Sequence, residues 1–184
     1  MLKALEIHTY EDYAALPGEE RCELIEGQFF MTPAPGFFHQ TVAGQIYHLL
    51  RQHLEGSKKW IAPLTPIDVI CSPHDVFQPD IVLIAARRKG IISERGLTGA
   101  PDLAVEVLSP SSHERDLLVK KKLYARYGVK EYWIVDPVAK TIEVLIPGGA
   151  VYHTLAVYEE ADSLASRLLP GFSPKLRKIF HKPY

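Results

Sequence analysis

The stretch Leu103-Ala104-Val105-Glu106-Val107-Leu108-Ser109-Pro110 decides how the chain folds. Its first six residues form an apolar run of strand length that contains one acid, and Ser109-Pro110 ends the run. Residues 131–135 form a second such run, which Asp136-Pro137 ends. Ser111 or Ser112 can cap a helix that reaches Tyr127 between the two runs, with Gly128 at its C′ position. A strand, a helix and a strand in this order predict two parallel strands joined by a right-handed crossover.

The remaining segments extend this unit on both sides. Thr9 and Asp12 resemble a capping box for a short helix over residues 10–16, and Ser173-Pro174 opens a short final helix to Phe180. The other expected elements are a hairpin (22–25 and 28–31), a helix (38–54), strands (60–70 and 80–85), a polar loop (87–100) and a second hairpin (141–146 and 151–158). This order predicts an α/β fold with a mixed sheet that helices cover on at least one face.

Composition is that of an ordinary globular chain. The 184 residues are 47% hydrophobic and 23% charged, which argues against a disordered chain or a fibre and predicts a single domain over residues 1–184. A formal net charge of −1 argues against a protein that holds nucleic acid by bulk positive charge. Two cysteines are too few for a disulfide scaffold, and the sequence contains neither an apolar run long enough for a membrane span nor a signal peptide. We therefore expect a cytoplasmic protein.

Two acids stand in or beside apolar strands. Glu106 shares one strand face with Ala104 and Leu108, so its carboxylate projects among apolar neighbours unless the strand is an exposed edge. Asp80 opens the run 81–84, twenty-six residues upstream. Two such carboxylates suit a hard divalent cation such as Mg²⁺, although an Asp after a Pro is often only a turn residue.

The predicted helix after Glu106 carries Asp116, Lys120 and Tyr124 at spacings of four. These side chains lie on one helical face, which is either a solvated face with an Asp–Lys ion pair or part of a site. Lys121 and Lys122 follow Lys120 directly and cannot share its direction. We expect them to face solvent or backbone.

A series of motifs in the chain resembles the Uma-type endonuclease family of the PD-(D/E)XK nuclease superfamily. The motifs run in order along nearly the whole chain: Glu23-Leu24-Ile25-Glu26-Gly27, Met31-Thr32-Pro33-Ala34-Pro35 with His39, Pro79-Asp80, residues 101–112, Asp116 with Lys120 and Tyr124, residues 128–137, and Pro170-Gly171-Phe172. The resemblance implies a restriction-endonuclease-like fold in which Asp80 and Glu106 bind Mg²⁺. The superfamily pattern has Lys two residues after the acid, where this chain has Leu108. In similar families that Lys can come from the neighbouring helix, and Lys120 is the matching position.

The same resemblance suggests further site residues. Glu23 matches an acid of the family's first motif and could reach the metal or its water, or could be an exposed strand residue. His39 could touch a phosphate or merely line its loop, and Tyr124 could hydrogen-bond in the cleft or belong to the core. The backbone carbonyl of Val107 could supply a third metal oxygen.

These residues predict a Mg²⁺-dependent endonuclease that hydrolyses phosphodiester bonds, most simply those of DNA, with Mn²⁺ as a substitute metal. The alternative is a non-catalytic nucleic-acid-binding or protein-binding module on the same fold, which Leu108 and the mildly acidic charge favour. Arg87-Arg88-Lys89 could contact the nucleic-acid backbone. Tyr132-Trp133 could support a homodimer, by analogy with nucleases that pair their sites.

Overall fold

The computed structural model describes residues 6–17, 21–109, 115–149 and 151–181. Its strands form two six-stranded sheets, each containing both parallel and antiparallel neighbours, where the sequence predicted one mixed sheet. The first sheet has the order β2 (Gln28–Met31), β1 (Cys22–Ile25), β5 (Asp75–Phe77), β4 (Asp68–Ser72), β8 (Gly96–Leu97) and β7 (Ile92–Ser93). The second has the order β12 (Tyr152–Tyr158), β11 (Thr141–Pro147), β10 (Glu131–Asp136), β9 (Leu103–Val107), β6 (Ile81–Ala85) and β3 (Trp60–Ile61). The fold is therefore mixed α/β, as expected.

Strand β9 lies inside the second sheet rather than at an edge. It pairs in parallel with β10 and antiparallel with β6, which confirms the predicted parallel pair. All five of its residues are buried, so the alternative of an exposed edge strand is excluded for Glu106. The predicted alternation also holds, because Leu103, Val105 and Val107 enter one hydrophobic cluster and Ala104 enters another.

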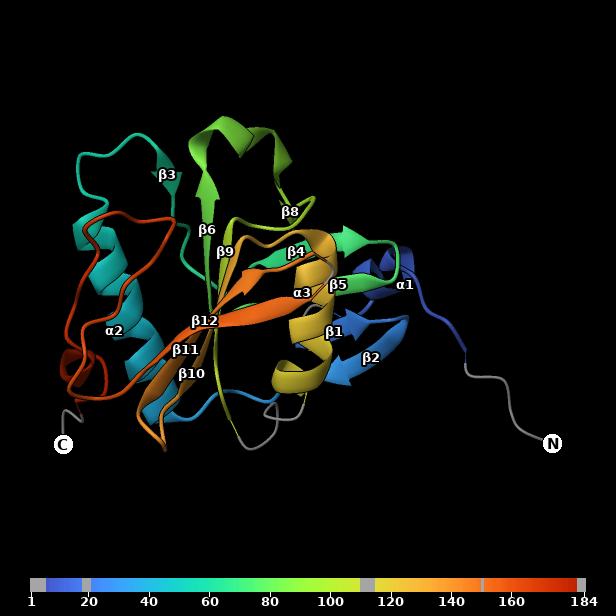
Figure 1. The fold of residues 1–184 in the computed structure, drawn as a ribbon. Helices are drawn as coiled ribbons and strands as arrows, with labels where there is room; N and C mark the ends of the chain where they lie inside the picture. Colours follow the sequence, from blue (N-terminus) through green and yellow to red (C-terminus); the bar gives the residue numbers. More distant parts are fainter. Residues whose placement is uncertain (1–5, 18–20, 110–114, 150, 182–184) are drawn as a thin grey trace.

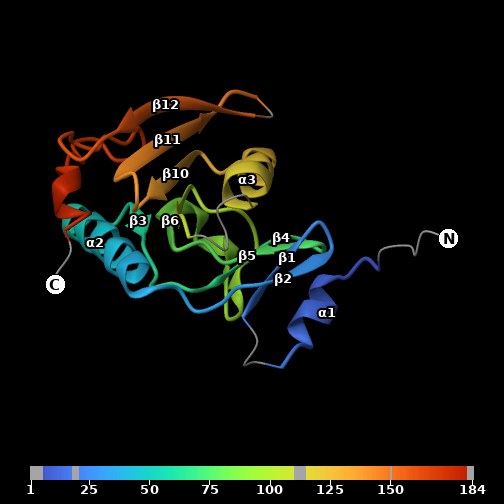
Figure 2. The same cartoon turned by 90° about the horizontal axis from the view of Figure 1, so that it is seen from below.

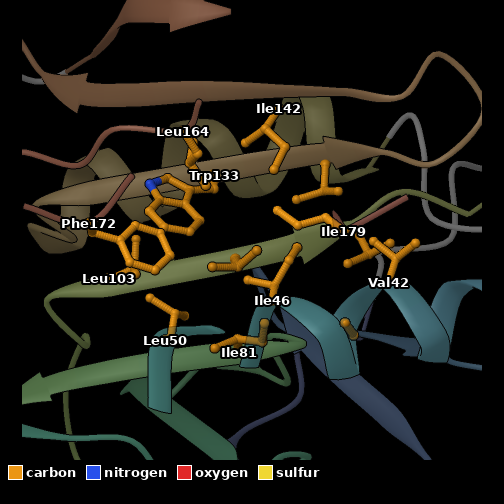
Figure 3. Close-up of a cluster of buried hydrophobic side chains, with 14 of the residues drawn as sticks. Val42, Ile46, Leu50, Ile81, Leu103, Trp133, Ile142, Leu164, Phe172 and Ile179 are labelled. Atoms are coloured by element: carbon orange, nitrogen blue, oxygen red, sulfur yellow. The ribbon is translucent and has the colours of Figure 1, made fainter. Parts of the chain in front are cut away.

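Helix α2 (Phe37–His53) covers the first of these faces. Val42, Ile46 and Leu50 recur at helical spacing and pack toward Leu103 and Trp133 of the sheet (Figure 3). Burying such side chains contributes about 1.5–3 kcal/mol each. The sequence placed this helix over residues 38–54, one residue later at each end.

The opposite face of the second sheet packs against α3 (Lys121–Tyr127) and the first sheet. One buried cluster joins Tyr124 of α3, Ile25 and Phe77 of the first sheet, and Ala104 and Tyr132 of the second. Figures 1 and 2 show α2 and the β1–β2 hairpin on opposite sides of the molecule, and Figure 1 shows β9 and β10 between them. Side chains that face away from α2 on β9 consequently point toward the junction of the two sheets.

The N-terminal elements agree with the sequence. Helix α1 (Tyr10–Ala14) has the predicted capping box, in which Thr9 and Asp12 exchange side-chain and backbone hydrogen bonds. Strands β1 and β2 form the predicted hairpin around Glu26 and Gly27, both of which have positive φ as a two-residue hairpin turn requires.

The expected strand over residues 60–70 is wrong, because two strands in different sheets replace it. Strand β3 belongs to the second sheet and β4 to the first, and the segment between them contains Pro63 and Pro66, which cannot donate to a strand ladder. The sequence also missed β5, a three-residue strand too short to show a pattern.

Other boundaries also need correction. The region 87–100 is not only a loop, since it contains a 3₁₀ helix η1 (Ala86–Ile91) and the short strands β7 and β8. The final helix is reduced to a 3₁₀ turn, η3 (Leu176–Lys178). A π-helical segment, η2 (Arg115–Lys120), leads into α3, and Gly128 ends α3 in the predicted left-handed conformation. The suggested caps Ser111 and Ser112 lie outside the described residues. Within the described ranges, no helix has both the length and the apolar character that crossing a membrane requires.

Candidate active site

Lys120 joins two carboxylates that come from different sheets. Its Nζ lies 2.9 Å from Oε1 of Glu106 on β9 and 2.8 Å from Oε1 of Glu23 on β1. All three residues are at most 3% exposed. Lysine and glutamate are rarely buried so completely unless they are paired, and each here has an opposite charge at contact distance. The alternatives of a solvated Lys120 and an exposed Glu23 are therefore excluded.

Tyr124 completes the environment of Glu106. It lies one helical turn after Lys120, and its hydroxyl donates to the same Oε1 of Glu106 at 2.7 Å. Burial and the nearby carboxylates of Glu106 and Glu23 raise the pKa of the Tyr124 hydroxyl well above its ordinary value. The phenol therefore keeps its proton and remains a hydrogen-bond donor to Glu106.

Glu23 is held from a second direction by backbone. The amide of Gln78 donates to Glu23 Oε1 at 2.8 Å, and the Gln78 side chain donates to Asp68 and to Tyr13. Sequence reasoning missed Gln78. The signal that could have indicated Gln78 was its position just before Pro79-Asp80. Its contact with Glu23 is made by the backbone amide, which every residue except proline has, so the residue type did not predict it.

Asp80 lies where β6 begins, next to the peptide that follows Glu106. Its Oδ2 accepts from the amide of Val107 at 2.8 Å and lies 3.3 Å from Nε2 of His39 in the first turn of α2. The hydroxyl of Thr65 donates to the Asp80 carbonyl, which fixes the backbone. Among the described residues no hydrogen bond or ion pair involves Asp80 Oδ1, and the side chain is 23% exposed. One carboxylate oxygen is thus fixed, and the other is available to a ligand.

The register of β6 and β9 brings Asp80 and Glu106 together. Ile81 pairs with Val105 in the antiparallel ladder, so one further step in the same register sets Asp80 opposite Glu106. Opposite residues of a ladder are direct neighbours. The hydrogen bond between Asp80 and Val107 shows that the two backbone segments remain adjacent at this step.

These oxygen atoms fit a hard divalent cation. Mg²⁺ in proteins is usually bound through one or two carboxylates and several waters, and Asp80 and Glu106 supply carboxylates beside the backbone of Val107. The described part of the chain contains no group of three or more His, Cys, Asp or Glu side chains arranged to hold a metal.

Comparison with protein-family models gives one match that spans most of the chain. Residues 9–177 match the model of Uma2, whose description is "Putative restriction endonuclease". The chain belongs to the Uma2 family. The solved structures include a similar chain, a crystal structure described as "a putative nuclease" from Anabaena variabilis, with 22% identity and a TM-score of 0.79 over 94% of this chain and 97% of that one. At this identity the likeness shows the shared fold. No curated protein matches the chain.

This Uma2 chain departs from the superfamily pattern at Leu108, which is buried in the hydrophobic cluster that includes Tyr124. A leucine there cannot donate to a carboxylate or a phosphate. The ammonium of Lys120, which comes from the helical segment, instead contacts Glu106. The structure thus brings the ammonium of Lys120 to Glu106, and its role in catalysis stays a prediction.

The structure also places most of the other residues that were singled out in the sequence of this Uma2 chain. Tyr132 and Trp133 are fully buried, so the suggestion that this pair supports a dimer interface is wrong. Arg88 forms an ion pair with Asp102, which gives it a structural contact, and Lys121 lies 3.5 Å from Glu143 at the surface. The side chain of Asp116 lies outside the described part of the structure.

Proposed function

We propose that this chain is a metal-dependent endonuclease that hydrolyses phosphodiester bonds in nucleic acid, and that its substrate is DNA. Membership of the Uma2 family and the nuclease-like fold support this reaction class. The observation that carries the proposal is the buried contact of Lys120 with Glu106, next to an Asp80 carboxylate that keeps one oxygen available.

Asp80 and Glu106 are the residues that would hold Mg²⁺, or Mn²⁺ in its place, with the carbonyl of Val107 as a third oxygen. When bound, such an ion lowers the pKa of a coordinated water and neutralises charge on a phosphate. The hydrogen bond from the Val107 amide fixes Oδ2 of Asp80 and leaves Oδ1 available to a ligand, and the hydrogen bond from Tyr124 orients the carboxylate of Glu106.

Lys120 is the residue that would orient the attacking water and stabilise the charge that develops on the phosphate. Its ammonium is held by Glu106 and Glu23, so little reorganisation is needed during the reaction. Glu23 acts as a positioning residue because it contacts Lys120. Tyr124 plays the same part for Glu106.

His39 is the residue that would contact the substrate phosphate. Its ring is mostly buried beside Asp80 and projects from the first turn of α2. A protonated imidazole there donates to a phosphate oxygen.

The test is a cleavage assay on double-stranded DNA, single-stranded DNA and structured RNA, each with Mg²⁺, Mn²⁺ or EDTA. We expect cleavage with either metal, none with EDTA, and a loss of at least 100-fold in Glu106→Gln. Glu143→Gln is the matched control, since it makes the same change on β11, two strands away from β9 in the same sheet, at a surface ion pair.

Cleavage that persists in EDTA and in Glu106→Gln would refute the proposed mechanism. Metal binding at Asp80 and Glu106 without cleavage of any of the three substrates would instead support a binding module, which is the function that Leu108 favours.

A further inference from the structure

A cavity lies on the other side of β1 from the acid–lysine cluster, which is formed by Glu23, Glu106 and Lys120. It has a volume of about 660 Å³, within the range of roughly 300–1,000 Å³ that small-molecule sites occupy. Tyr10, Tyr13, Arg21, Asp68, Gln78 and Arg95 line it. None of these residues is used by the proposed mechanism, except that the backbone of Gln78 supports Glu23.

The carboxylate of Asp68 is an acceptor on the polar floor of this cavity, and Glu94 is the other acid in the lining. Asp68 Oδ1 accepts from the Tyr13 hydroxyl at 2.8 Å and from Gln78 Nε2 at 3.0 Å. Gln78 Nε2 also donates to the Tyr13 oxygen at 3.2 Å, so both of its hydrogens are used. Among the described residues none donates to Asp68 Oδ2. This oxygen therefore suits a ligand that carries N–H donors.

The walls combine aromatic rings with cationic side chains. The rings of Tyr10 and Tyr13 project from the same side of α1, with centroids 6.2 Å apart and planes inclined by 23°. Flat surfaces of this kind bind nucleobases by stacking. Arg21 and Arg95 also line the cavity, and neither forms an ion pair with another residue of the described chain. Their guanidinium groups are available to a phosphate.

We propose that this cavity binds a nucleotide, either a unit of a nucleic-acid strand or a free nucleotide, and that it prefers guanine. The inference rests on the proposed function for the identity of the macromolecular substrate. Guanine offers two adjacent donors, N1–H and the N2 amino group, to Asp68 Oδ2. Thymine offers a single N–H that is flanked by two carbonyl oxygens. A carboxylate repels these two oxygens. The tyrosines stack on the base, and the arginines neutralise the phosphate.

The cavity and the acid–lysine cluster share a wall. Cys22 of β1 lines the cavity, and the next residue, Glu23, reaches Lys120 on the other side of the strand. Gln78 likewise contacts Asp68 with its side chain and Glu23 with its backbone amide. A base held in the cavity would therefore lie one strand away from the groups that act on the backbone.

Binding is measured by calorimetry in EDTA, on the full chain and on Glu106→Gln, so that cleavage cannot intervene. The probes are guanosine monophosphate, thymidine monophosphate, inorganic phosphate, and a short oligothymidine with or without one central guanine. We expect the guanine-containing probes to bind at least about tenfold more tightly than the thymine-containing ones and than phosphate. Binding of the oligonucleotide alone assigns the cavity to a substrate strand, and binding of the free nucleotide identifies an effector.

The variants separate this inference from the proposed function. Asp68→Asn can still accept from Tyr13 and Gln78, and we expect it to lose about tenfold in guanine affinity. Arg95→Ala should weaken every phosphate-bearing probe, whereas Arg177→Ala, an exposed arginine in η3, should change none. Equal affinity for guanine and thymine in the parent protein, or unchanged affinity in Asp68→Asn, would overturn the inference even if the protein cleaves DNA. Guanine-selective binding without cleavage would support the inference about the cavity and contradict the proposed nuclease activity.

Discussion

Lys120 Nζ lies 2.9 Å from Oε1 of Glu106, fourteen residues earlier in the chain, although both side chains are buried. Lys121, the next residue, is partly exposed and pairs with Glu143 instead. The two lysines therefore form a matched pair in which one is placed among acids inside the fold and the other at its surface.

Lys120→Met should lower the cleavage rate at saturating substrate by at least about 100-fold, because it removes a preorganised cation. The same change should cost about 3–5 kcal/mol in unfolding free energy, since it leaves two buried carboxylates without their cation. Lys121→Met should leave both quantities near those of the parent protein. The double variant Lys120→Met, Glu23→Gln should recover part of the stability but none of the activity. Recovery of the activity would show that Lys120 acts only on folding.

Leu108→Lys in a Lys120→Met background tests whether the lysine can occupy its usual position. Residue 108 lies on the same strand face as Glu106, two residues further on, so an ammonium there can reach the carboxylate. We expect partial recovery of cleavage, measured as kcat, together with lower stability because Leu108 is buried among apolar side chains. If both variants fold and neither cleaves, the helix position of the lysine is itself required.

Asp102 should make stability depend on pH. Burial alone would raise the pKa of its carboxyl, but hydrogen bonds from the Ala85 amide and Lys130 and the charge of Arg88 outweigh burial and lower it. Because the folded-state pKa lies below the ordinary value of 3.8, this contribution is present above pH 4 and is lost as the pH falls through the folded-state pKa.

Urea unfolding from pH 6 to about pH 2.5 checks this expectation. Asp102→Asn should be less stable than the parent at pH 6, and the difference should shrink as the pH falls. A difference that stays constant across the range would contradict the assignment of this dependence to Asp102.

Two glycine substitutions should act in opposite directions. A Cβ at Gly96 would lie 2.2 Å from the carbonyl oxygen of Asp68, and φ there is +135°, so Gly96→Ala should destabilise the fold by about 3 kcal/mol or more. Gly44 lies within α2 with open space around it, so Gly44→Ala should raise the unfolding free energy by about 0.5–1 kcal/mol. Thermal unfolding measures both, and a stabilising Gly96→Ala would be incompatible with the β4–β8 pairing.

The sequence was most informative where one signal was strong and local. The run around Glu106 predicted a buried strand, its parallel partner and the alternation of its faces, and Gly128 marked the end of α3. The split of residues 60–70 between two sheets depends on which distant strands pair, and β5 is only three residues long. Neither the split of residues 60–70 nor the strand β5 produces a periodic pattern in the sequence. For the same reason, the sequence could suggest Glu23 and Lys120 separately but could not show that they touch.

The contact between Glu23 and Lys120 joins the first sheet to the helical segment that connects β9 and β10 of the second. Neither the N-terminal hairpin nor the β9–β10 unit contains both carboxylates that hold the lysine. The cluster therefore forms only when the fold is assembled, because its charged side chains come together only after both sheets have docked. A folding intermediate with a detached hairpin would leave Lys120 with one partner fewer and free to adopt other rotamers. Any hydrolytic activity of this cluster should therefore appear only late in folding.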